Sequence, residues 1–299
     1  MPAETLISLL GWGRGRLGQE GIDTAALDAR LLLQHVTGVK HETLIGEPQT
    51  EVADEKAADY CALIERRARH EPVSRIVGVR EFYGRNFRLS PATLDPRPDT
   101  ETLISAAVEL LRGKPSSYIL DLGTGTGAIP VTLLAELPGA RAVATDISSE
   151  ALQIALLNAR ENGVADRLEV VLASWFDGVE GSFDLIISNP PYLLTSKINS
   201  LDPEVRDWDP HRALDGGVDG LDCYRAIAVG AGDRLHPKGL VVLEIGEGQG
   251  GQVTEIFANK GFDLVTVHRD LAGHVRCLVF GKRKMGVGNG PDLGYIPTR

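Results

Sequence analysis

The chain has 299 residues, of which 43% are hydrophobic and 24% charged, a composition typical of a globular protein with a sizeable core. Its net charge of −10 and the lack of a five-residue basic run argue against broad binding to nucleic-acid phosphates. Cys61, Cys223 and Cys277 are far apart in the sequence, so we expect neither a disulfide framework nor a metal site. No signal peptide or apolar membrane span is found, so we expect a cytoplasmic protein.

The first 72 residues are predicted to form a small helical domain, because apolar residues recur there at helical spacing in three runs. Asp23 is a candidate N-cap of the second helix. Glu71-Pro72 is expected to end the third, since a residue before proline avoids the α region. Residues 73–96 contain short β-type pieces, and we expect them to form a β-hairpin linker.

From residue 97 to 281 the helical and β-type patterns alternate, which predicts an α/β domain with a mostly parallel sheet and helices on both faces. A short polar connection joins the last two strands, so the final strand should be antiparallel. Residues 282–299 are rich in glycine and proline and are predicted to be a disordered tail. We expect helices at 103–111, 128–137 and 149–162, and strands at 118–122, 142–145, 168–172, 183–188, 240–245, 262–267 and 275–280.

A glycine-rich run, Asp121-Leu122-Gly123-Thr124-Gly125-Thr126-Gly127, follows a predicted strand and begins a helix. Backbone amides and the helix dipole at such a turn favour a polar ligand. The alternating glycines differ from the GxGxxG spacing of dinucleotide sites, which disfavours a nicotinamide dehydrogenase. Asp121 before the first glycine suits a ligand that carries an ammonium and a carboxylate. The structural alternative is a tight strand-to-helix turn.

Three further residues follow predicted strands. Asp146 lies about twenty residues beyond the glycines, where a carboxylate can accept hydrogen bonds from both ribose hydroxyls. It could instead cap a helix or lie in solvent. Trp175 could wall an adenine ring or belong to the core. Glu244 could reach the same crevice or make a structural pair.

The strongest signal is Asn189-Pro190-Pro191-Tyr192, directly after the predicted strand 183–188. Two prolines make this turn rigid. The Asn189 side-chain oxygen and the Pro190 carbonyl then become two fixed acceptors for a planar NH2 group that is aimed at an electrophile. Tyr192 can pack against a flat substrate. A purely structural proline turn is the alternative.

These motifs resemble the class I methyltransferases that use S-adenosylmethionine, and within them the peptide chain release factor glutamine methyltransferases. The resemblance covers roughly residues 5 to 281. Asp209-Pro210 departs from the Glu-Pro usual in the family, and the tail beyond Lys282 has no counterpart. The narrower family is indicated by Glu71-Pro72-Val73, Glu81-Phe82-Tyr83-Gly84, Pro96-Arg97-Pro98-Asp99-Thr100-Glu101, Ala213-Leu214-Asp215-Gly216-Gly217 with Gly220-Leu221, and Leu243-Glu244-Ile245-Gly246.

The resemblance implies a Rossmann-like class I methyltransferase sheet over residues 97–281, with an antiparallel final strand, and an N-terminal domain (1–72) that docks the substrate. It implies methylation of the side-chain N5 of the glutamine in the Gly-Gly-Gln loop of release factors. The implied ligands of S-adenosylmethionine are Gly123, Thr124, Gly125, Thr126, Gly127, Asp146, Trp175 and Asn189. The implied substrate-binding residues are Asn189, Pro190, Pro191 and Tyr192, of which Asn189, Pro190 and Tyr192 are the catalytic candidates.

Two other functions compete with this interpretation. A DNA or RNA adenine N6-methyltransferase could use the same turn on a flipped base, but the acidic charge and the lack of a basic recognition segment disfavour it. A non-catalytic binding module would require damaged motifs, whereas both motifs are intact. We expect a monomer that binds neither nucleic acid nor membrane. Asp99 or Thr100, after Arg97, is expected to cap the following helix.

Overall fold

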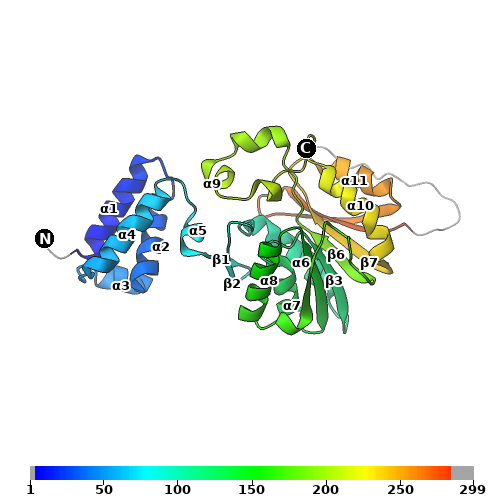
Figure 1. Cartoon of the computed structure of the whole chain (residues 1–299), viewed down its shortest axis with the longest axis horizontal. Helices are drawn as coiled ribbons and strands as arrows, with labels where there is room; N and C mark the ends of the chain where they lie inside the picture. The colour runs from blue at the N-terminus through cyan, green and yellow to red at the C-terminus, as the bar shows by residue number, and fades with distance from the viewer. Residues whose placement is uncertain (1–3, 284–299) are drawn as a thin grey trace.

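The computed structural model describes residues 4–283, which form a helical N-terminal part and a larger α/β part joined by a narrow connection (Figure 1). The N-terminal helices pack around fully buried Leu17, Leu32, Leu33, Tyr60 and Ile64, so their apolar stripes face one another. These helices are α1 (Leu6–Gln19), α2 (Ala25–Thr37), α3 (His41–Gly46) and α4 (Asp54–Arg67).

Two predicted helix boundaries were wrong. The residue that precedes α2 is Thr24 and not Asp23, and its side chain makes no capping hydrogen bond. The last long helix ends at Arg67, before the proline, because the chain turns through His70 in the left-handed region at φ +63°. The short helix α3 lies in a stretch that the three apolar runs did not cover.

The linker is a β-hairpin preceded by one helical turn. Strands β1 (Val79–Phe82) and β2 (Arg85–Arg88) pair antiparallel, as predicted. Tyr83 and Gly84 both have positive φ, the conformation required by a type I′ two-residue turn. Residues 73–77, expected as β-type, instead form helix α5 (Val73–Val77), which ends at Gly78 with φ +77°.

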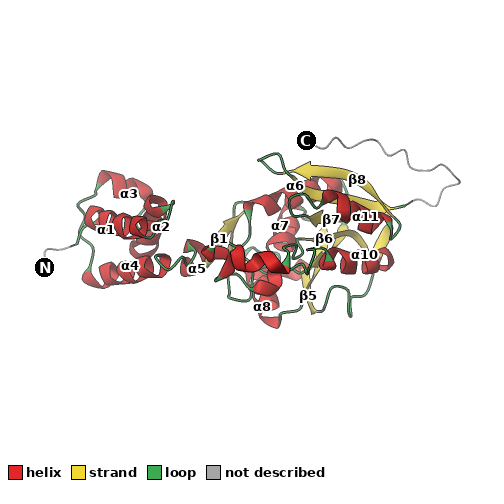
Figure 2. Cartoon of the chain, turned by 90° about the horizontal axis from the view of Figure 1, so that it is seen from above, coloured by secondary structure: helices red, strands yellow, loops and turns green. Residues whose placement is uncertain are grey.

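The α/β part contains a seven-stranded sheet in the order β5-β4-β3-β6-β7-β9-β8. Figure 2 shows helices on both of its faces. Helices α6 and α7 pack their apolar residues against one face of the sheet, and α10 and α11 pack theirs against the other face. The helices are α6 (Glu101–Leu111), α7 (Ala128–Glu136), α8 (Ser149–Glu161), α9 (Pro203–Arg206), α10 (Asp222–Arg234) and α11 (Gly250–Ala258).

The mostly parallel sheet with an antiparallel final strand is confirmed, since β9 runs antiparallel to both β7 and β8. Lys282, expected in the tail, is the last residue of β9, and residues 284–299 lie outside the described residues. The strands are β3 (Ser117–Leu122), β4 (Ala140–Asp146), β5 (Leu168–Leu172), β6 (Phe183–Ser188), β7 (Leu235–Glu244), β8 (Phe262–Arg269) and β9 (Val275–Lys282).

The strand order places the functional motifs at one edge of the sheet. Strand β3 pairs in parallel with β4 on one side and with β6 on the other, and β6 pairs in parallel with β7. The chain therefore reverses its direction of winding between β3 and β6, where α/β sheets open a crevice beyond the strand ends. The loops after β3, β4, β6 and β7 meet there. No helix among residues 4–283 is long and apolar enough to span a membrane.

Candidate active site

The glycine loop between β3 and α7 uses its glycines in two ways. Gly123, Gly125 and Gly127 have φ angles of +74°, +55° and +77°, which residues other than glycine rarely adopt. A Cβ on Gly127 would lie 2.9 Å from the Cβ of Ala155, so this glycine lets α7 approach α8. The first two glycines have open space where a Cβ would be, and they leave the loop backbone accessible.

The loop is fixed to the end of β4. The amides of Gly123 and Thr124 donate to the Thr145 carbonyl over 2.9 Å, and the Gly125 amide donates to Asp146 Oδ2 over 2.9 Å. Asp146 Oδ1 accepts from the Ser148 amide, also over 2.9 Å. Each carboxylate oxygen retains acceptor capacity for a ligand hydroxyl. Asp146 is not the helix cap, because the Ser148 hydroxyl caps α8.

A cavity of about 300 Å³ lies over this loop, at the small end of the range for ligand pockets. Trp175 lines this cavity, and its backbone is strained, with a φ of +53°. The same side chain also packs against the core. Both predicted roles of Trp175 are therefore compatible with its position. Gly127 does not line the cavity. The predicted site residues that do are Gly123, Thr124, Gly125, Thr126, Asp146, Trp175, Asn189 and Pro191.

The base of the glycine loop carries unpaired polar atoms. Both carboxylate oxygens of Asp121 and the hydroxyl of Thr124 are buried and have no hydrogen-bond partner among the described residues. Burial raises the pKa of Asp121 to about 7. An unpaired buried carboxylate is costly, and a ligand ammonium group nearby would offset that cost. The accessible loop backbone, Asp146 in the cavity lining and the buried Asp121 beneath the loop therefore fit a ligand with an ammonium group and a ribose.

A second cavity of about 310 Å³ lies on the other side of the turn after β6. Pro190 and Tyr192 line this second cavity, whereas Pro191 lines the first. Asn189 lines both. Burial raises the pKa of Tyr192 to about 12, which keeps its phenol neutral. The turn therefore forms the wall between two adjoining spaces, and Asn189 stands where their contents would meet.

The turn is held by groups that the sequence did not reveal. The Ser188 hydroxyl donates to the Leu122 carbonyl over 2.7 Å and ties the end of β6 to the end of β3. Gln249 Nε2 donates to the Tyr192 carbonyl over 3.0 Å. Gly216 packs against the turn so closely that a Cβ there would lie 2.8 Å from the Tyr192 Cα. Two hydrogen bonds and one close backbone contact thus fix the position of the turn.

The expected capping role of Asp99 and Thr100 was wrong. Neither side chain caps α6, because Thr100 itself has helical backbone angles, whereas an N-cap residue is extended. The Thr100 hydroxyl instead donates to Glu244 Oε2 over 2.6 Å and accepts from Asn189 Nδ2 over 3.1 Å. Glu244 lines the second cavity, and burial raises its pKa to about 7. Both alternatives for Glu244 therefore apply, since it reaches the crevice and is structurally paired.

The residue that departs from the family pattern, Asp209, is a buried bridge. Its carboxylate accepts from Arg75 of α5 over 2.6 Å and from Arg97 over 2.5 Å. Arg97 lines both cavities of the site. The shorter aspartate side chain thus still joins the linker to the segment that precedes α6.

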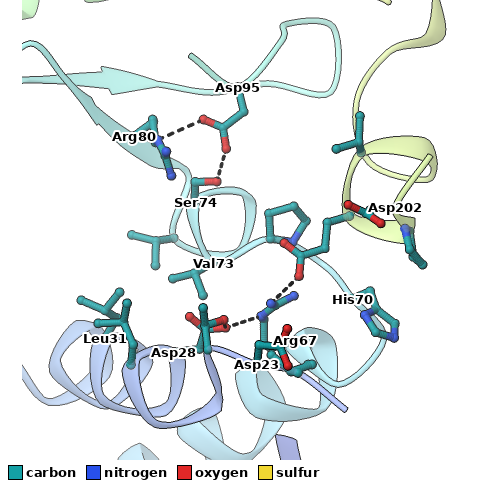
Figure 3. Close-up of a pocket in the computed structure, with 18 of the residues that line it drawn as sticks. Asp23, Asp28, Leu31, Arg67, His70, Val73, Ser74, Arg80, Asp95 and Asp202 are labelled. Carbon is teal, nitrogen blue, oxygen red and sulfur yellow. Dashed lines mark hydrogen bonds and ion pairs between the residues drawn. The ribbon is translucent and has the colours of Figure 1, made fainter. Parts of the chain in front are cut away.

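A larger groove of about 1010 Å³ separates the N-terminal helices from the α/β part (Figure 3). Arg67 crosses its floor, 2.8 Å from Asp28 of α2 and 2.5 Å from Glu204 of α9. On the linker side, Asp95 accepts from Ser74 and lies 3.5 Å from Arg80. Charged side chains of both parts therefore line a single groove.

The sheet, the glycine loop, the acidic end of β4 and the rigid turn after β6 define a class I methyltransferase that uses S-adenosylmethionine. Family models agree, because residues 8–78 match the PrmC N-terminal domain and residues 98–201 match the methyltransferase small domain. The chain belongs to the family of release factor glutamine methyltransferases.

Relatives with high sequence identity support this family assignment. A release factor glutamine methyltransferase of Agrobacterium fabrum is 47% identical, over 89% of this chain and 94% of that protein. One of Cereibacter sphaeroides is 49% identical, over 87% and 92% of the two chains. A bifunctional methyltransferase of Rickettsia felis is 37% identical, over 89% of this chain and 56% of that protein.

Solved structures share the fold at lower identity. The hMettl16 catalytic domain, solved with the MAT2A 3′UTR hairpin 6, matches with a TM-score of 0.55 at 18% identity, over 76% of this chain and 82% of that chain. A methyltransferase of Pyrococcus furiosus matches with a TM-score of 0.51 at 21% identity, over 73% and 98% of the two chains. These similarities concern the fold alone.

Proposed function

We propose that this enzyme methylates the side-chain nitrogen of the glutamine in the Gly-Gly-Gln loop of a peptide chain release factor. The position of Asn189 carries the proposal. Its amide nitrogen is engaged by Thr100, while its oxygen is left for a substrate NH2 group between the two cavities. An acceptor at this place suits a carboxamide.

The chain's own residues would act by positioning. An amide nitrogen is a weak nucleophile because its lone pair is delocalised, so orientation matters and can contribute roughly 7 to 11 kcal/mol. S-adenosylmethionine, when bound, supplies a methyl group on a positively charged sulfur. Asn189 Oδ1 and the Pro190 carbonyl would accept from the two substrate N–H bonds and favour the pyramidal nitrogen of the transition state. Tyr192 would pack against the flat amide.

The first cavity would hold the cofactor. Its ammonium group would lie near the unpaired Asp121 carboxylate, and its ribose hydroxyls would donate to Asp146. Trp175 would cover the adenine. The accessible backbone from Gly123 to Thr126 would contact the methionine part, and Gly127 would act through the packing of α7 on α8.

The groove between the N-terminal helices and the α/β part would dock the body of the release factor. Carboxylates outnumber arginines in its lining, among them Asp23, Glu81 and Asp202, so basic and polar groups of the partner would fit it. Arg97 lines the groove as well as both cavities of the site. A glycine-flanked loop could pass along this side chain to Asn189, because glycine lets the backbone come close. We expect a monomer acting in the cytoplasm.

The test is incubation with labelled S-adenosylmethionine and, separately, a release factor, duplex DNA or ribosomal RNA, followed by mapping of the label. A release factor whose loop glutamine is replaced by alanine is the matched control. We expect label on the glutamine side chain of the intact factor and none on the control. Label on adenine, with the release factor untouched, would replace this proposal by an adenine methyltransferase.

A further inference from the structure

Glu244 is a carboxylate that the fold holds in an unusual place. Its side chain is 1% exposed at the end of β7, and the Tyr224 hydroxyl fixes its backbone by donating to its carbonyl over 3.0 Å. No basic side chain within residues 4–283 forms an ion pair with it. The nearby Arg276 is instead paired with Asp99 and Asp270, each over 3.1 Å. The Thr100 hydroxyl donates to the carboxylate.

The direction of these hydrogen bonds decides how Asn189 is oriented. An ionised carboxylate only accepts, so the single Thr100 proton points to Glu244. The Thr100 oxygen can then only accept, and the Asn189 atom beside it has to be the amide nitrogen. The Asn189 oxygen is thereby turned toward the cavities. With a proton on Glu244 the order could reverse, and Asn189 would present its NH2 group to the substrate.

We propose that Glu244, acting through Thr100, is a positioning residue that holds the Asn189 amide with its oxygen toward the substrate. This inference rests on the proposed function, because the orientation matters only if Asn189 accepts from a substrate NH2. With the reversed orientation two NH2 groups would face each other, and neither could accept. The carboxylate thus sets the acceptor character of a residue that it does not touch.

The surroundings of Glu244 set the pH range in which this control operates. Burial favours its protonated form, Asp99 adds to that effect, and Thr100, Arg276 and Tyr192 oppose it. Acidification through the pKa of Glu244 should therefore lower turnover. The titratable and charged groups that face it are Asp99 before α6, Tyr192 after β6, Tyr224 in α10, and Arg276 and Cys277 in β9.

The test compares the wild-type enzyme with Glu244→Gln, Thr100→Val and Thr100→Ser on an intact release factor. The kcat and KM values are measured between about pH 5.5 and 9 at saturating S-adenosylmethionine. For Thr100→Val we expect kcat to fall by about 10- to 100-fold, with a smaller change in KM. Glu244→Gln should lower kcat less, because the glutamine amide still offers an oxygen that can accept from Thr100. The acidic decline of the wild-type profile should be absent from both. Thr100→Ser restores the hydroxyl and should retain both the decline and most of the kcat.

Wild-type kcat with an unchanged acidic decline in Glu244→Gln and Thr100→Val would overturn the positioning role. A Thr100→Ser variant as impaired as Thr100→Val would also overturn it, since the methyl group and not the hydroxyl would then matter. If Glu244→Gln fails to fold, as judged by its melting temperature, the two Thr100 variants decide. Failure of the wild-type enzyme to methylate the release factor would instead refute the proposed function.

Discussion

The backbone amide of Gly125 donates to the Asp146 carboxylate over 2.9 Å, and this bond joins the loop after β3 to the end of β4. The same carboxylate lines the first cavity. Asp146 therefore shapes the loop over which the cofactor would lie and also supplies acceptors to it.

Replacing Asp146 with alanine should weaken S-adenosylmethionine binding by about 1 to 3 kcal/mol, because buried ribose hydroxyls would lose their acceptor. Isothermal calorimetry measures this change. Asp184→Ala is the matched control, since that carboxylate also accepts from a backbone amide, that of Tyr118, but lines a different cavity. Unchanged affinity in Asp146→Ala would reject the ribose assignment.

Replacing Asn189 with alanine should separate chemistry from binding. Turnover on the release factor should fall by about a hundredfold or more, as when a preorganised polar group is removed from other sites. The dissociation constant of the cofactor should change little. Asn162→Ala, at the end of α8 and outside both cavities, is the control. Turnover within a few fold of wild type would leave the turn with only a structural role.

Replacing Asp121 with asparagine should change stability and cofactor binding in opposite directions. The folded pKa near 7 lies above the usual aspartate value, so the cofactor-free protein loses stability as pH rises from about 4 to 7. Asp121→Asn removes this cost and should raise the unfolding free energy at pH 8 by about 1 to 4 kcal/mol, with little effect near pH 4. Denaturant unfolding at both values tests this.

The same variant should bind S-adenosylmethionine more weakly, because the ligand ammonium would lose its charged partner. Calorimetry on the folded variant at pH 8 is the second measurement. A variant that gains stability and binds the cofactor as tightly as wild type would contradict the ammonium assignment.

Replacing Gly216 with alanine should disturb the turn after β6. Its new Cβ would lie 2.8 Å from the Tyr192 Cα and 2.9 Å from the Pro191 carbonyl oxygen, and neither backbone can move freely. We expect a loss of about 1 to 3 kcal/mol in unfolding free energy, together with reduced turnover. Gly232→Ala in α10 meets nothing within 4 Å and should be neutral or stabilising. Equal behaviour of the two variants would contradict the steric argument.

The sequence predicted the sheet and the place of its motifs because both depend on local patterns. Alternating periods indicate parallel strands, and parallel strands bring the ends of β3, β4 and β6 to one edge. Helix α10 escaped prediction although Tyr224, Ile227 and Ala231 have helical spacing. The two glycines that begin α11 obscure its start.

The contacts around Asn189 could not be predicted in the same way. Thr100 and Glu244 are 144 residues apart, and no local pattern links a threonine before a helix to a glutamate at a strand end. The hydrogen bond from Gln249 to the Tyr192 carbonyl likewise depends on the tertiary structure alone. Local preference favoured a capping role for Thr100, which was wrong because Thr100 ends a 3-10 helical turn (Pro98–Thr100) that continues directly into α6. The assigned roles of the individual site residues stay predictions.

The ion pair between Arg67 and Glu204 limits how this chain can be recombined with its relatives. A chimera made of the first 72 residues of this chain and the remainder of a relative would keep Arg67 but take position 204 from the other parent. Arg67 is 3% exposed, and without Glu204 its one remaining carboxylate partner would be Asp28. An exchange of the N-terminal part should therefore transfer the residue at position 204 as well, so that Arg67 keeps its partner from α9.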